Sequence, residues 1–145
     1  MWYNPIIAWI LRSPLHGLLG GSLMVVTYRG RKSGKVYHTP VSCVRDGDTW
    51  LVASFRKRTW WRNLRGDVPV SVRVQGRDWQ TTCEVLEDGE GVAANLMTYL
   101  RAVPHYAQAF DVALDADEQP STEDVARAAQ TRVMIRIPSS IKDTR

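Results

Sequence analysis

Alternating valines are the feature of this sequence that most restricts how it can fold. Valine occupies every second position from residue 68 to residue 74, which places all four side chains on one face of an extended strand. A strand that is apolar on one face needs neighbouring strands and a core to cover that face, because a lone strand or hairpin is barely stable in water. The chain therefore has to build a β-sheet.

Five further segments have the alternating or β-branched pattern of strands. They cover residues 22–29, 35–45, 49–55, 78–86 and 132–137. Asp46 and Gly47 form a strong hairpin signal between two of them. Pro40 lies inside the segment at residues 35–45, where its missing N–H indicates a strand edge or a bulge. Short connections make neighbouring strands antiparallel, so we predict six mainly antiparallel strands that form a closed or split β-barrel.

Helices are predicted to flank this barrel. Their patterns cover residues 59–65, 90–102 and 122–130, while residues 111–118 resemble an acidic surface loop. A length of 145 residues is typical of one domain. The whole chain is therefore predicted to be a single α+β domain.

Residues 1–19 are predicted to form an N-terminal amphipathic helix. Asn4 and Pro5 suit its start, whereas Arg12 and Pro14 interrupt the apolar run too early for a membrane-spanning helix. The segment is also a poor signal peptide, because no basic region leads it. Two interpretations stay open: a helix that packs over the core or a ligand pocket, and a helix that lies in a membrane surface. The expected location is the cytoplasm, with peripheral contact at the inner face of the cell membrane in the second interpretation.

Positive charge is concentrated in the middle of the chain. Residues 29–77 hold twelve Lys and Arg against three acidic residues, whereas the rest of the chain holds seven basic and twelve acidic residues. Such a block attracts phosphates, nucleic acids, anionic lipids or a multiply charged cofactor. Part of it is a glycine-bounded turn, GRKSG at residues 30–34, which can offer backbone N–H groups together with Arg, Lys and Ser donors to a phosphate.

Tryptophans follow the second basic run of this block. Arg56, Lys57 and Arg58 precede Trp60 and Trp61. Aromatic rings beside cations suit a flat anionic heterocycle, and they also suit single-stranded nucleic acid, whose bases stack on indole rings.

Protein-based catalysis would need a nucleophile or a metal site elsewhere in the sequence. The three histidines lack the spacing of metal ligands, and both cysteines fall inside predicted strands. No nucleophile or metal motif is present. We therefore predict no metal site, and an enzyme with this sequence would depend on a bound cofactor for its chemistry.

The order of the motifs resembles a known family. GRKSG at residues 30–34, then Thr39 and Pro40, then a strand and WWRNL at residues 60–64 are similar to the deazaflavin-dependent nitroreductases over about residues 21–137. Members of this family are split-barrel oxidoreductases, related to the FMN-binding split barrels. They bind coenzyme F420, a flat deazaflavin with a phosphate and an oligoglutamate tail, and such a polyanion fits the basic block. The resemblance implies hydride transfer between F420 and an electrophilic acceptor such as a quinone or a nitroaromatic.

The resemblance also implies roles for individual residues. The phosphate side of the cofactor would be held by Arg31, Lys32, Ser33 and Gly34. The deazaflavin ring would be lined by Thr39, Pro40 and Val41, and the pocket floor closed by Ala53 and Ser54. The acidic tail would face Lys57. The far wall would be built by Trp60, Trp61 and Asn63. A segment that ends in Phe110 resembles the aromatic segment over the substrate, and Tyr106 within it is the candidate that orients the acceptor or donates a proton.

Other readings of the same residues stay open. FMN is the alternative cofactor, because it is also flat and anionic but lacks the long acidic tail. A non-enzymatic barrel that binds lipid or another hydrophobic ligand would account for the apolar N-terminal segment. Nucleic acid is not expected as a partner, because the tryptophans lie in a helix that matches the family motif. A small-molecule hydride acceptor is expected, and a homodimer is a further expectation because split barrels often pair.

Overall fold

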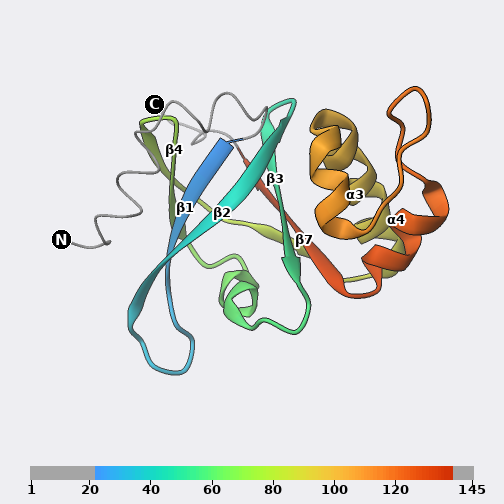
Figure 1. The fold of residues 1–145 in the computed structure, drawn as a ribbon. Helices are drawn as coiled ribbons and strands as arrows, with labels where there is room; N and C mark the ends of the chain where they lie inside the picture. The colour runs from blue at the N-terminus through green and yellow to red at the C-terminus, as the bar shows by residue number, and fades with distance from the viewer. Residues whose placement is uncertain (1–21, 139–145) are drawn as a thin grey trace.

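The computed structural model describes residues 22–138. These residues form an antiparallel sheet with helices beside it (Figure 1), which confirms the predicted α+β split-barrel class with seven strands in place of six. The predicted helix at residues 1–19 lies outside the described residues. The strands are β1 (Ser22–Arg29), β2 (Val36–Asp46), β3 (Thr49–Phe55), β4 (Val70–Val74), β5 (Arg77–Thr81), β6 (Glu84–Leu86) and β7 (Arg132–Pro138). The helices are η1 (Trp60–Leu64), α3 (Gly89–Ala102), η2 (Pro104–Phe110) and α4 (Thr122–Ala129), where η marks a 3₁₀-helix.

The additional strand comes from a break that the sequence pattern does not reveal. The prediction of one strand over residues 78–86 is wrong, because the chain leaves the sheet at Thr82 and Cys83. The strand order is β5-β4-β1-β2-β3-β7-β6, so β5 and β6 form the two opposite edges. Three Cα–Cα steps join the end of β5 to the start of β6, which limits that distance to roughly 11 Å. The end of one edge strand therefore lies close to the start of the other, which requires the sheet to curl toward a barrel.

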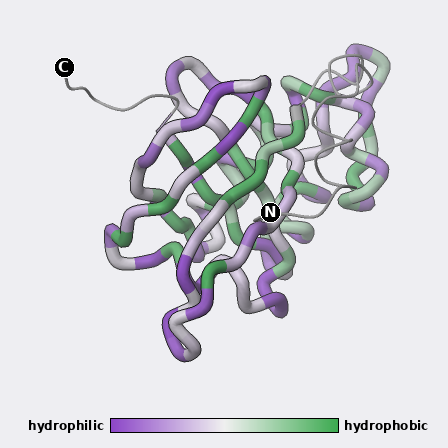
Figure 2. The backbone as a smooth tube through the Cα atoms, turned by 90° about the vertical axis from the view of Figure 1, so that its left-hand side faces the viewer, coloured by the Kyte–Doolittle hydropathy of each residue, from purple (hydrophilic) through white to green (hydrophobic). Residues whose placement is uncertain are grey.

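The rolled sheet separates two apolar cores. Neighbouring residues in the central strands point to opposite faces: Cys43 and Val52 lie in the barrel interior, whereas Val44 and Leu51 pack against the helices. Strands buried on both faces need apolar residues at consecutive positions, which explains the continuous apolar run in β3. In Figure 2 the hydrophobic parts of the tube lie along the crossing strands, and the hydrophilic parts lie in the outer turns.

The helices α3 and α4 cover the outer face of β3 and β7 (Figure 1). α4 begins at the predicted residue, and α3 begins one residue earlier than predicted: the Asp88 carboxylate accepts a hydrogen bond from the backbone N–H of Gly91 at 2.7 Å, and Ser121 Oγ accepts one from the backbone N–H of Asp124 at 3.2 Å. These caps satisfy backbone N–H groups that have no partner within the helix. The segment η2 was not predicted as helical, and none of the described helices is long and apolar enough to cross a membrane.

The barrel is split between β2 and β3. The two strands pair only from Cys43 opposite Val52 to Asp46 opposite Thr49. Beyond that point β2 continues alone with β1, while β3 continues with β7 (Figure 1). Pro40 lies in the diverging part of β2. Because β3 does not pair with this part, Pro40 lies at a strand edge, as the sequence predicted. The helix η1 follows β3 in the chain and packs against β1 and β6.

Candidate functional site

The tip of the β1–β2 hairpin is held by its own backbone. The N–H of Gly30 donates to the carbonyl of Lys35 at 2.7 Å, and the N–H of Gly34 donates to the carbonyl of Gly30 at 2.9 Å. Gly34 adopts φ +73°, a left-handed conformation that glycine adopts without steric penalty. The Arg29 guanidinium donates to the Gly34 carbonyl at 2.7 Å. This closed turn exposes the side chains of residues 31–33 at the end of the hairpin.

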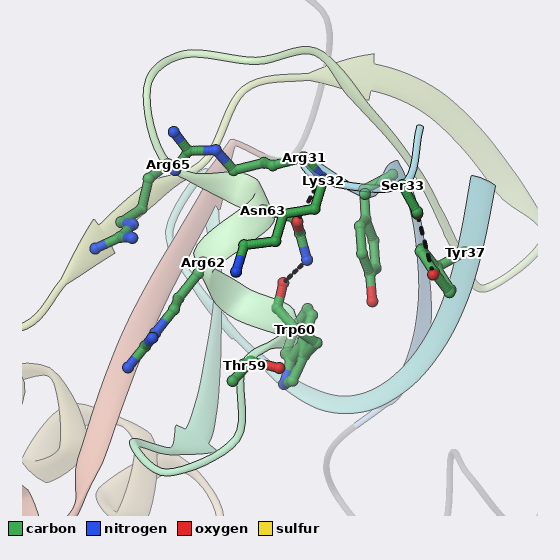
Figure 3. Close-up of a pocket in the computed structure, with 11 residues that line it drawn as sticks. Arg31, Lys32, Ser33, Tyr37, Thr59, Trp60, Arg62, Asn63 and Arg65 are labelled. Atoms are coloured by element: carbon green, nitrogen blue, oxygen red, sulfur yellow. Dashed lines mark hydrogen bonds between the residues drawn. The ribbon is translucent and has the colours of Figure 1, made fainter. Parts of the chain in front are cut away.

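Asn63 joins this turn to η1. Its amide oxygen accepts a hydrogen bond from the backbone N–H of Arg31 at 2.9 Å, and its amide nitrogen donates to the carbonyl of Trp60 at 3.0 Å. Both bonds are drawn in Figure 3, which shows the hairpin tip facing η1. Since one amide is bonded at both ends, it fixes the position of the cationic turn relative to the tryptophan.

A cavity of about 800 Å³ lies between the turn and the helix. Its lining residues are Tyr28, Gly30, Arg31, Lys32, Ser33, Tyr37, Thr59, Trp60, Arg62, Asn63 and Arg65. Four of them are cations and none is acidic. Arg65 is paired with Glu87, with 3.3 Å between the guanidinium and carboxylate atoms. We call this space the cationic cavity, because its charge favours a ligand with several negative groups.

Aromatic rings form another part of the same cavity. Tyr28 and Tyr37 stack with 5.8 Å between ring centroids, and the Trp60 ring lies 6.1 Å from that of Tyr28. A Cβ atom at Gly30 would come within 2.8 Å of the Tyr37 ring and 2.9 Å of Ser33 Oγ. Gly30 therefore allows the rings and the turn to approach closely, and the cavity combines flat apolar surfaces with positive charge.

A second cavity of about 440 Å³ opens in the split between β2 and β3. Its lining residues are Pro40, Val41, Ser42, Ala53, Ser54, Phe55, Arg58, Trp60, Tyr99, Tyr106, Ala109, Phe110 and Arg132. We call it the aromatic cavity. Trp60 lines both cavities, and its indole N–H donates to Ser54 Oγ at 2.9 Å. The indole ring is thus a fixed wall shared by a cationic space and an aromatic one.

Among the side chains that line the aromatic cavity, Tyr106 is the candidate proton donor. Its ring centroid lies 5.7 Å from that of Tyr99. Burial raises the pKa of the Tyr106 hydroxyl above its usual value, and a side-chain hydrogen bond with Ser42 acts in the opposite direction. A phenol with a raised pKa is protonated at neutral pH, so it can donate a hydrogen bond or a proton to a ligand.

The predicted site residues divide between the two cavities. The cationic cavity receives Arg31, Lys32, Ser33 and Asn63, and the aromatic cavity receives Pro40, Val41, Ala53, Ser54 and Tyr106, with Trp60 in both. Four predicted residues line neither cavity. Gly34 closes the turn, and the Thr39 hydroxyl is hydrogen-bonded to the Tyr28 hydroxyl at 2.9 Å. The Lys57 ammonium lies 5.8 Å from the Phe55 ring centroid. Trp61 is only 1% exposed and lies in the barrel core.

Several lining residues were not predicted from the sequence. Arg62 belongs to the same short helix as Trp60 and Arg65 directly follows that helix, and the charge of residues 29–77 was the signal that could have pointed to them. Phe55, Tyr99 and Arg132 come from three separate elements. No local pattern marks them, because only the rolled sheet and the packed helices bring them together.

Comparison with known proteins gives the family. A family model described as F420H(2)-dependent quinone reductase matches residues 13–113. This chain belongs to that family. Coenzyme F420 is therefore its cofactor, and the protein is an F420-dependent oxidoreductase, as the resemblance implied. No curated protein matches the chain.

Solved structures agree on the fold. A conserved hypothetical protein from Mycobacterium tuberculosis has 16% sequence identity and a TM-score of 0.57, with 90% of this chain and 82% of that chain covered. An FAD- and heme-binding protein from Mycobacterium smegmatis has 17% identity and a TM-score of 0.55, with 90% and 67% covered. At these identities the likeness concerns the fold alone.

The cationic cavity fits the chemistry of this cofactor. F420 carries a phosphate and several carboxylates, and the cavity presents four cations with no lining carboxylate among the described residues. Arg and Lys at these positions can donate charge-assisted hydrogen bonds to both kinds of oxygen. The indole of Trp60 also lines the aromatic cavity, so it adds a flat surface for a fused ring beside the cationic space.

Proposed function

We propose that this protein is an F420-dependent oxidoreductase that reduces a quinone. The observation that carries the proposal is the pair of cavities that share Trp60, one cationic and the other aromatic. A cationic anchoring space beside an aromatic reaction space is what a polyanionic hydride carrier and a flat hydrophobic acceptor need. The reduced deazaflavin supplies the hydride when it is bound.

The residues of the cationic cavity hold the acidic end of the cofactor in this proposal. Arg31, Lys32 and Ser33 bind the phosphate side, and Arg62 and Arg65 add charge that the sequence comparison did not assign. Gly34 acts through the shape of the turn. Thr39 acts through its bond to Tyr28. Trp61 supports η1 from the core, and Lys57 stays a proposed partner of the acidic tail outside the two cavities.

The residues of the aromatic cavity hold the reacting groups. The two sides of the split are formed by Pro40 and Val41 of β2 and by Ala53 and Ser54 of β3. Tyr106 lines the same cavity. Fixed walls that place donor and acceptor in contact can lower the barrier by on the order of 7–11 kcal/mol. The Tyr106 hydroxyl orients the acceptor or gives it a proton.

Binding and turnover test this proposal separately. The purified protein is titrated with F420 and with FMN while tryptophan fluorescence is followed, and F420 is expected to bind more tightly because of its acidic tail. Reduced F420 is then mixed with a naphthoquinone or a nitroaromatic, and the fluorescence of oxidised deazaflavin is recorded. Oxidation with the quinone supports the proposal. Tighter binding of FMN, or no oxidation with the quinone, would contradict it.

A matched pair of variants locates the anchoring residues. Lys32→Ala removes a cation that lines the cationic cavity, whereas Lys35→Ala removes an exposed cation of the same hairpin that lines neither cavity. The first change should weaken F420 binding by roughly tenfold, since one charge-assisted hydrogen bond is lost. The second should leave it within about twofold. Equal effects would mean that only the general charge of the hairpin matters.

A homodimer and a peripheral membrane contact stay proposals beside this function. The membrane contact is expected through residues 1–19, whereas Phe55 and Val36, exposed at 44% and 49%, leave apolar surface on β3 and at the start of β2 for a second copy. Sedimentation of the purified chain, with and without liposomes, separates a dimer from membrane binding. A monomer that does not bind liposomes would contradict both.

A further inference from the structure

Arg132 is a buried cation in the wall of the aromatic cavity. The residue is 8% exposed, and it comes from the first position of β7. Its guanidinium carbon lies 4.0 Å from the ring centroid of Phe55 and 4.9 Å from that of Phe110. All three residues line the cavity, so the guanidinium is held between two rings at the place assigned to the acceptor.

The charge of Arg132 is not neutralised by an ion pair within residues 22–138. One N–H donates to Thr131 Oγ1 at 2.7 Å, and the nearest electrostatic partner, Asp111, lies outside ion-pair distance. A guanidinium has five N–H donors in a planar fork. Removal of a cation from water is unfavourable unless other groups replace its hydration, and two aromatic faces replace only part of it. The remaining donors border a cavity that is large enough for a ligand.

We propose that Arg132 is a specificity-determining residue that binds an oxygen of the hydride acceptor. The inference rests on the proposed function and names the acceptor class: conjugated molecules whose oxygen becomes negative when the hydride arrives. A quinone that gains a hydride takes up two electrons and one proton, while reduced F420 loses them. The product carries one negative charge on oxygen until a second proton reaches it. A fixed guanidinium stabilises that charge without reorganisation, which is the usual form of electrostatic catalysis.

Arg58 is the other cation that lines this cavity, and it differs from Arg132 in exposure. Arg58 is exposed to water, whereas Arg132 is buried between the two rings. A charge near water is screened, and a charge in a poorly hydrated wall acts more strongly on a ligand beside it. Acceptor specificity is therefore assigned to Arg132.

The test uses the protein without cofactor and two stable bicyclic probes. 1-Hydroxy-2-naphthoate carries a carboxylate, and 1-naphthol is its neutral counterpart; both are titrated while tryptophan fluorescence is followed. We expect the wild-type protein to bind the anion at least roughly tenfold more tightly, in line with one charge-assisted bond. Equal affinities in the wild-type protein would overturn the proposal without any variant.

Substitutions separate this role from a structural one. Arg132→Met should remove the preference for the anion and leave the affinity for 1-naphthol within about twofold. Arg101→Met removes an exposed cation of α3 that lines neither cavity, and it should keep the wild-type preference. A variant of Arg132 that weakens both probes equally would show that the residue only holds Phe55 and Phe110 in place. Circular dichroism checks the fold, and Arg132→Lys, which keeps the charge, should retain part of the preference.

Turnover distinguishes failure of this inference from failure of the proposed function. If reduced F420 is oxidised by the quinone with unchanged kcat and KM in Arg132→Met, and the probe preference also persists, the inference fails and the function stands. If the wild-type protein prefers the anion but oxidises no reduced F420, the function fails and the anion site stands. A lower kcat together with a lost preference supports both.

Discussion

The backbone N–H of Arg31 and the side-chain oxygen of Asn63 are joined by a hydrogen bond of 2.9 Å, although 32 positions separate them in the chain. The bond links a turn that carries two cations to a helix that carries the indole shared by both cavities. The cavity for the acidic end of the cofactor thus depends on one amide. The same amide donates to Trp60, so the wall of the second cavity depends on it as well.

Asn63→Ala is expected to weaken F420 binding about tenfold and to lower the free energy of unfolding by about 1–3 kcal/mol, because two hydrogen bonds are lost at a partly buried position. Fluorescence titration and urea denaturation measure the two effects. Asn95→Ala is the matched control. Asn95 donates to the Gly91 carbonyl at 2.8 Å and accepts from Arg136 at 2.6 Å, away from both cavities, so its loss should lower stability alone. Unchanged F420 affinity in Asn63→Ala would show that the turn is positioned without this amide.

Arg62→Gln is expected to weaken F420 binding about tenfold at low ionic strength and by less at high salt, since exposed charges are screened over a Debye length of about 8 Å at physiological salt. The binding constant is measured by fluorescence at several salt concentrations. Arg77→Gln makes the same charge change on β5, where Arg77 contacts the Trp79 ring and lines neither cavity. An equal loss in both variants would mean that the net charge of the protein, rather than the cationic cavity, attracts the cofactor.

The sequence predicted what depends on local pattern. Alternating valines indicated β4, and Asp46 with Gly47 indicated the hairpin turn after β2. The five residues 30–34, with their glycines and cations, indicated the turn that carries Arg31. These features need only neighbouring residues to be recognised. The resemblance then gave the cofactor class, which the family match confirms.

The rest of the site depends on closure of the sheet. The break at Thr82 sends β6 to the opposite edge, and nothing in the alternating pattern of residues 78–86 marks it. Arg132 reaches the cavity because β7 pairs with β3, opposite Phe55. Trp61 was expected in the wall since it follows Trp60, but consecutive residues of a helix point in different directions, and this one lies in the core.

Stability at alkaline pH should fall because both cysteines are buried. Burial raises the pKa of Cys43 to about 12 and that of Cys83 to about 12. In the unfolded chain a thiol has a pKa of about 8.5. The contribution of this pKa difference to the free energy of unfolding is fully present below that pH and is lost as the pH rises toward 12. Each thiol then lowers the free energy of unfolding by about 1.4 kcal/mol per pH unit.

Urea denaturation at pH 7, 8.5 and 10 measures this loss. The double variant Cys43→Ala with Cys83→Ala should be less stable at pH 7, because two small cavities form in the core. Its stability should nevertheless fall less steeply between pH 8.5 and 10 than that of the wild-type protein. The same slope in both proteins would assign the alkaline loss to other groups.

Tyr106→Phe should lower kcat for quinone reduction by on the order of 10²-fold with little change in KM, because the ring that packs on Tyr99 stays and only the hydroxyl is lost. The hydroxyl has to be protonated to act as a donor. Since burial raises the pKa of Tyr106, the wild-type rate should be independent of this group through neutral pH and fall only above the usual titration range of a tyrosine. Steady-state rates from pH 6 to 11 test both parts, and Tyr106→Phe should lack that alkaline fall.

Ser42→Ala provides the finer test of the same hydroxyl. The side-chain hydrogen bond with Ser42 lowers the pKa of Tyr106 against the larger effect of burial, so its removal should raise that pKa and move the alkaline fall of the rate to higher pH. Packing alone gives no reason for such a shift, because Ser42 is exposed and the change removes a single hydroxyl. If Tyr106→Phe keeps the wild-type kcat, or if the alkaline fall stays at the same pH in Ser42→Ala, the proton comes from another group and Tyr106 only shapes the cavity.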